Sequence, residues 1–210
     1  VGENGLAATT VANPAMTFMV AVAMLVGVGG NALAAIKLGE RKKRVAERVL
    51  GNSFVLLVGA GVVAWIVGLA ALDPILRASG ADDAVLPHAR AFMTVIIAGC
   101  PLQFVAFGMN NFIRTAGAPN RALVTMLIGL VVSTALNYLF VLRLGWGVEG
   151  SALATIIGQA ASCAAVLWYF VFTRNVPLKL HFRYMAPHLR VIGTILSLGF
   201  ASFAVQAGMA

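Results

Sequence analysis

Polar side chains recur at helical spacing inside two long apolar segments of the chain. Ser133 and Asn137 lie four residues apart in one segment, and Ser151, Thr155 and Gln159 follow in steps of four in the next. Residues four apart share one face of a helix, so each set predicts a polar stripe in oily surroundings. Within a membrane such groups need a partner, water, an ion or a substrate, which makes a functional site the first hypothesis for them.

The chemistry open to these stripes is that of neutral hydroxyls and amides. For each hydroxyl alone, a bond to a carbonyl of its own helix is favoured over a ligand contact. Asn137 is different, because a helix backbone cannot satisfy both its donors and its acceptor. All seven acidic residues fall at segment ends or in connections, so the apolar segments hold no carboxylate that would carry a proton.

An enzyme and a metal centre are both disfavoured by the sequence. Cys100 and Cys163 lie in apolar segments without CxxC spacing, and the three histidines are far apart at segment edges. No nucleophile and base recur in a recognisable motif. We therefore expect no catalytic residue and no cofactor, only a transported or coupling ion.

A third polar stripe precedes the other two. Gln103, Asn110 and Arg114 are spaced seven and four residues apart, and so face one neighbour or cavity. Asn110 is a candidate for a cavity contact, whereas Arg114 is expected to anchor the helix end at the membrane interface.

The composition places all three stripes in membrane-spanning helices. Hydrophobic residues make up 60% of the chain and charged residues 10%, well outside the range of soluble domains. The sequence predicts an all-α integral membrane protein, because the apolar segments each approach the ~20 residues that a spanning helix needs. The six predicted spans are residues 12–36, 50–72, 88–113, 120–142, 148–172 and 190–210.

The connections between these spans predict an orientation. Residues 37–48, 114–121 and 174–190 together hold twelve basic and two acidic residues, and the remaining ends and connections hold three basic and five acidic ones. The positive-inside rule assigns the first set to the cytoplasm and the N-terminus to the other side. The excess of basic residues is thus explained by topology, and no nucleic-acid partner is expected.

Two further local features bear on shape. Pro101 lies inside the third span and predicts a kink there, serving either a conformational change or only packing. Residues 174–190 are too polar to span and are expected to lie partly along the membrane surface.

Several motifs resemble the multidrug and toxic compound extrusion (MATE) family of bacterial efflux transporters. They occur in the family's order and cover nearly the whole chain. They are Val1–Ala8, Gly39-Glu40, Ile113–Pro119, Ser133–Tyr138, and Gly147–Thr155 with Gln159.

The resemblance implies a fold of twelve helices in two six-helix lobes. Residues 1–173 would form the N-terminal lobe without its first helix, 174–189 a cytoplasmic linker, and 190–210 the start of the C-terminal lobe. We accordingly expect the chain to be part of a longer protein that includes a second lobe. The resemblance also implies positions for the family's polar residues. The family's cavity threonine falls on Thr155, and one of its asparagines falls near Asn110. The family's aspartate falls on Asn137, and the asparagine that precedes this aspartate falls on Ser133.

The function implied is export of drugs or organic cations in exchange for protons or sodium, from the bacterial inner (plasma) membrane. Expected partners are small amphipathic or cationic substrates, the lipid bilayer and the second lobe. The candidate pathway residues are Asn137, Ser133, Thr155, Asn110 and Gln159. Two alternatives remain open: a flippase for lipid-linked precursors from the related superfamily, which would call for a basic central cavity, and a membrane scaffold that transports nothing.

Overall fold

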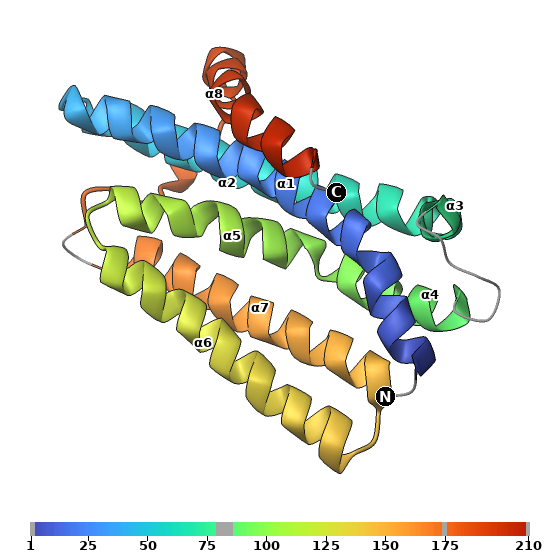
Figure 1. Cartoon of the computed structure of the whole chain (residues 1–210). Helices are drawn as coiled ribbons and strands as arrows, with labels where there is room; N and C mark the ends of the chain where they lie inside the picture. Colours follow the sequence, from blue (N-terminus) through green and yellow to red (C-terminus); the bar gives the residue numbers. More distant parts are fainter. Residues whose placement is uncertain (1–2, 79–85, 174–175, 209–210) are drawn as a thin grey trace.

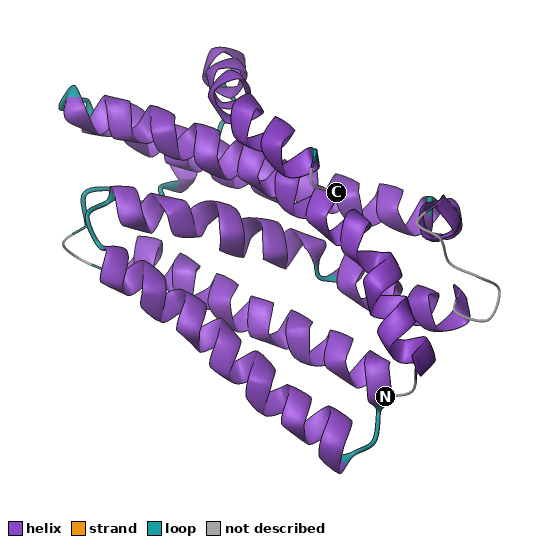
Figure 2. Ribbon diagram, in the orientation of Figure 1, coloured by secondary structure: helices purple, strands orange, loops and turns teal. Residues whose placement is uncertain are grey.

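The computed structural model describes residues 3–78, 86–173 and 176–208, and these residues contain helices and no strand. Figure 2 shows helices throughout the described part of the chain. The expected all-α fold is confirmed. The helices are α1 (Glu3–Gly39), α2 (Lys43–Ala70), α3 (Leu72–Ala78), α4 (Leu86–Ala98), α5 (Cys100–Thr115), α6 (Pro119–Asn137), the π-helix η1 (Tyr138–Arg143), α7 (Gly147–Phe172), the 3-10 turn η2 (Phe182–Tyr184) and α8 (Leu189–Ala207).

Six spans are accounted for by this arrangement. Five helices are long and apolar enough to cross a bilayer, and the bent pair α4–α5 supplies a sixth crossing. In Figure 1, α6 and α7 run as a hairpin beside α5, while α1 and α2 cover α5 from the other side and α8 lies on α1. The sequence therefore identified every span, although helix ends differ by several residues.

The predicted kink at Pro101 is present and large. The axes of Ala89–Ala98 and Cys100–Thr115 differ by 55°. Proline lacks the N–H that would bond the carbonyl four residues back, and its ring crowds that carbonyl, so the helix breaks here. Gly61 of α2 packs on the break, since a Cβ at Gly61 would lie only 2.6 Å from the Pro101 Cα.

The basic connections gather at one end of the bundle. The α1–α2 turn, the α5–α6 turn and the segment after α7 all lie there (Figure 1). We call this end the basic end, and its cytoplasmic location stays a prediction of the positive-inside rule. Three residues counted in the charge balance, Asp82, Asp83 and Arg174, lie outside the described residues.

Ion pairs close the α1–α2 turn at the basic end. Glu40 contacts the ammonium groups of Lys42 at 2.8 Å and Lys37 at 3.0 Å. The hydrogen bond from Lys42, followed by that from Lys37, holds the pKa of the Glu40 carboxyl below its usual value. The carboxylate thus stays ionised and paired at neutral pH.

The segment before α8 is anchored on the bundle. Among its described residues, Val176 and Leu178 are buried, and the Leu180 N–H bonds the Phe170 carbonyl. The Asn52 amide donates to the Tyr184 carbonyl at 3.3 Å and accepts from the His188 N–H at 2.8 Å. The expectation of a linker lying along the membrane surface missed this attachment, because it depends on side chains of α2 that are distant in sequence.

Backbone contact joins α8 to α1. A Cβ added to Gly29 would lie 2.7 Å from the Gly199 nitrogen, and one added to Gly199 would lie 2.7 Å from the Leu25 carbonyl carbon. Helices in lipid associate through such close approaches of small residues, because water no longer drives them together. The position of α8 therefore depends on the absence of side chains at this crossing.

We expect Gly199→Leu to separate α8 from α1. Overpacking of this kind costs about 1–3 kcal/mol, which lowers the apparent melting temperature by roughly 2–10 °C for a chain of this size. Thermal unfolding of the purified protein in detergent measures the change. Gly193→Leu is the matched control, because a Cβ at Gly193 meets nothing within 4 Å. Equal melting temperatures for the two variants would contradict the role of this crossing.

Candidate functional site

The face of α6 that carries Ser133 packs closely on α7 across their hairpin. A Cβ on Gly158 of α7 would lie 2.6 Å from the Ser133 Cβ, and one on Gly129 of α6 would lie 2.9 Å from the Ser162 Cβ. Two small residues four apart on each helix thus interlock. Ser133 therefore faces Gly158 and Ser162 of α7 rather than the stripe of Ser151, Thr155 and Gln159. Gln159 is next to that face.

The end of α6 is unusual beside Asn137. The α-helix stops at this residue and continues as the π-helix Tyr138–Arg143, in which one extra residue per turn widens the coil. The chain then turns through Gly145 and Gly147, whose φ values of 69° and 56° lie in the left-handed region that glycine adopts without strain. The Phe140 and Trp146 rings stack with centroids 5.1 Å apart and close the turn.

The side chain of Asn137 has no hydrogen-bond partner among the described residues. This side chain is half-buried. The same holds for the side chains of Ser133 and Gln159, both half-buried. In an apolar setting these groups are available to water, an ion or a substrate.

Thr155 has a local partner instead. Its hydroxyl donates to the Ser151 carbonyl at 2.9 Å, one turn back on the same helix. This is the simple interpretation that the sequence favoured for isolated hydroxyls. Its remaining acceptor capacity is what Thr155 can offer to a ligand.

Asn110 is buried in an interhelical tie. Its amide donates to the Ala122 carbonyl at 2.9 Å and to the Thr125 hydroxyl at 2.8 Å, both on α6. Only 6% of the residue is exposed. Its contacts are those of a brace between α5 and α6 rather than of a group facing a cavity.

Gln103 is a further candidate, which the sequence analysis did not include among the pathway residues. It lies on the same stripe as Asn110 and is 6% exposed, yet its side chain has no hydrogen-bond partner in the described part of the chain. The spacing of the stripe indicated that Gln103 and Asn110 share a helix face. Nothing in the sequence showed that α6 provides hydrogen-bond acceptors for Asn110 and none for Gln103.

The electrostatics of the candidate site are those of neutral groups. The buried acid Glu47 lies at the basic end, 3.9 Å from the Lys43 ammonium and 4.0 Å from the His181 imidazole. No three His, Cys, Asp or Glu side chains come together as a metal centre within the described ranges. The half-buried polar groups on α6 and α7 therefore offer amide and hydroxyl atoms, and no charge, to a ligand.

Comparison with known proteins gives a consistent result. The family model MatE matches residues 1–139. The multidrug export protein MepA of Staphylococcus saprophyticus is 23% identical over 200 residues, which is 94% of this chain and 44% of that protein. The chain spans about half the length of the curated relatives it matches.

Two solved structures of multidrug resistance MATE family transporters of the MOP superfamily are also similar. The inward-facing one has a TM-score of 0.93 and 28% identity, covering 99% of this chain and 47% of that chain. The outward-facing one has a TM-score of 0.91 and 28% identity, with coverages of 98% and 46%.

We expect Asn110→Ala to weaken the α5–α6 contact. The change leaves the Thr125 hydroxyl without its donor, and losing a buried amide bond costs about 1–3 kcal/mol. Asn111→Ala is the control, because the Asn111 amide bonds only its own helix, to the Phe107 carbonyl at 3.3 Å. Thermal unfolding in detergent should show a lower melting temperature for Asn110→Ala than for Asn111→Ala. If the two melt alike, Asn110 is not a brace.

Proposed function

This chain belongs to the MatE family, and from that premise we propose that the protein exports small amphipathic or cationic compounds across a membrane, the inner membrane in bacteria. Export would be driven by exchange for protons or sodium. Residues 1–173 would supply most of one lobe, residues 174–189 the linker and residues 190–210 the beginning of a second lobe. The relatives named as multidrug exporters support the substrate class.

The observation that carries this proposal is the unpartnered polar group of Asn137. It is half-buried at the end of α6, whose residues 126–132 are all apolar, and Ser133 lies one turn away on the same face. A few polar anchors in an otherwise apolar surface suit a binding site that accepts many substrates. Gln159 and Gln103 extend the set of available amides.

The side-chain chemistry of Asn137 limits which coupling ion could bind at this position. An amide does not titrate, so Asn137 cannot carry a proton where the family resemblance places an aspartate. Amide and hydroxyl oxygens are ligands for a hard cation such as sodium. Either sodium binds through Asn137 and its neighbours, or protons are carried by acidic residues outside these helices.

The structural comparison supports a lobe that moves as a unit. The chain superposes almost equally on the inward-facing and the outward-facing transporter, with TM-scores of 0.93 and 0.91. A half that keeps its internal shape in both states is what alternating access by rigid lobes requires.

We expect Asn137→Ala to reduce dye efflux at least about fivefold, the effect of losing one hydrogen bond of about 1 kcal/mol to a bound substrate or ion. Efflux from cells expressing equal amounts of protein measures it, and membrane insertion should be unchanged. Thr134→Ala is the control, since this exposed hydroxyl lies on another face of α6. Undiminished efflux in Asn137→Ala would rule out its role.

Asn137→Asp tests the coupling ion. The substitution restores a titratable group, so we expect export to acquire a dependence on pH between about 4 and 7, where carboxyl groups in apolar sites titrate. Efflux from proteoliposomes is measured with a sodium gradient alone and with a proton gradient alone. A wild-type protein that responds only to protons, with Asn137→Asp unchanged in both assays, would exclude coupling at this position.

A further inference from the structure

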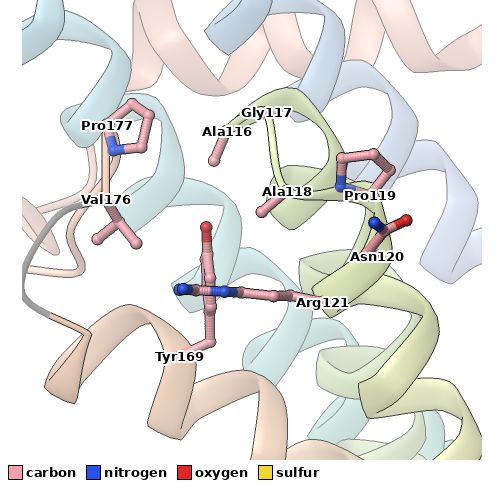
Figure 3. Close-up of a pocket in the computed structure, with 9 residues that line it drawn as sticks. All are labelled: Ala116, Gly117, Ala118, Pro119, Asn120, Arg121, Tyr169, Val176 and Pro177. Atoms are coloured by element: carbon pink, nitrogen blue, oxygen red, sulfur yellow. The ribbon is translucent and has the colours of Figure 1, made fainter.

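A pocket at the basic end lies apart from the candidate transport site. It has a volume of about 430 Å³ and is enclosed by the α5–α6 turn, the end of α7 and the segment after α7. Ala118, Arg121, Tyr169 and Val176 are among its lining residues (Figure 3). The volume is in the range of small-molecule sites.

The hydroxyl of Tyr169 points into this pocket. The residue is only 5% exposed, and Figure 3 shows its hydroxyl directed between Ala118 and Val176. No described residue exchanges a hydrogen bond with it. A buried phenol usually has a partner, so this donor is available to a ligand.

Arg121 supplies a positive charge to the same space. Its guanidinium carbon lies 5.7 Å from the centre of the Tyr169 ring, crossing the ring in Figure 3. No carboxylate or carbonyl of the described residues pairs with this guanidinium. The ring thus orients the arginine while leaving its N–H groups unused.

The first turn of α6 adds one backbone donor and the positive end of a helix dipole. This 19-residue helix starts at Pro119, and the preceding Ala118 provides no side-chain cap. Pro119 has no N–H, and the Arg121 and Ala122 N–H groups donate to the Ala118 carbonyl at 3.0 and 3.1 Å, which leaves the Asn120 N–H for a ligand. The helix dipole also makes this end attractive to an anion. A guanidinium, a phenol and an uncapped helix start therefore converge on one pocket.

We infer that this pocket binds a phosphate group, carried either by an anionic lipid headgroup or by a soluble phosphate ester. Arginine pairs with phosphate oxygens in bidentate fashion, and helix starts bind the same group. The pocket opens where the α6 span begins, which is headgroup depth. This binding site is separate from the proposed export pathway and does not depend on transport activity.

The test measures binding to the full-length protein in detergent. Short-chain phosphatidylglycerol, phosphatidylcholine, glycerol 3-phosphate and inorganic phosphate are titrated separately, with native mass spectrometry for the lipids and calorimetry for the soluble compounds. Arg121→Gln should weaken phosphate binding at least about tenfold, and Tyr169→Phe about fivefold. Arg190→Gln, an exposed arginine of the basic end outside the pocket, should change binding less than about twofold.

The probes separate the two sources of phosphate. Phosphatidylglycerol binding that glycerol 3-phosphate does not displace identifies a lipid headgroup, whereas binding of the soluble compounds with the same variant profile identifies a free ester. Equal binding of phosphatidylglycerol and phosphatidylcholine, with no binding of the soluble compounds, overturns the inference. Phosphate binding by Arg121→Gln that equals binding by Arg190→Gln also overturns the inference. If Arg121→Gln does not fold, binding by Tyr169→Phe is compared with binding by Arg190→Gln instead.

Discussion

Close approach of helix backbones is the constraint on which this structure depends. In lipid, apolar side chains gain little by leaving their surroundings, so helices associate where small residues allow many short contacts. The described residues use this device at several crossings, among them Gly29 with Gly199, Gly27 with Gly108, Gly61 with Pro101 and Gly129 with Gly158. Each crossing holds two helices together through a narrow strip of small residues. The wide remaining faces, most of all those of α6, stay exposed and apolar for lipid, substrate or another part of the protein.

Polar groups divide into paired and unpaired sets along the spans. Some of them join helices: Asn110 bonds Thr125, and the Thr115 hydroxyl donates to Asn31. Farther along α6, Ser133 and Asn137 have no such partner among the described residues. A buried amide that is satisfied specifies packing, whereas one that is not satisfied costs free energy unless something else binds it. The division separates structural from functional candidates without reference to any relative.

The sequence predicted structural features that depend on residues close together in the chain. It did not predict features that depend on contacts between residues far apart in the chain. The bend at Pro101 follows from one missing N–H, and the six spans follow from hydrophobic length, so both were predictable. The roles of Asn110 and Ser133 were not, because spacing gives the face of a helix but not what lies opposite. Only the fold shows that α6 satisfies Asn110 and that Gly158 meets Ser133. The attachment of the linker to Asn52 escaped prediction for the same reason.

Charge at the basic end serves more than orientation. The positive-inside rule explains why basic residues collect there but not how each is used. The two acidic residues of this end are both engaged: Glu40 pairs with Lys37 and Lys42, and Glu47 lies beside Lys43. Arg121 is left without an acidic partner in the described chain, held over an aromatic ring at the start of a helix. Arg121 is exposed, and its guanidinium lies over the Tyr169 ring at the edge of a pocket, so an anion bound there would supply the acidic partner that the described residues lack.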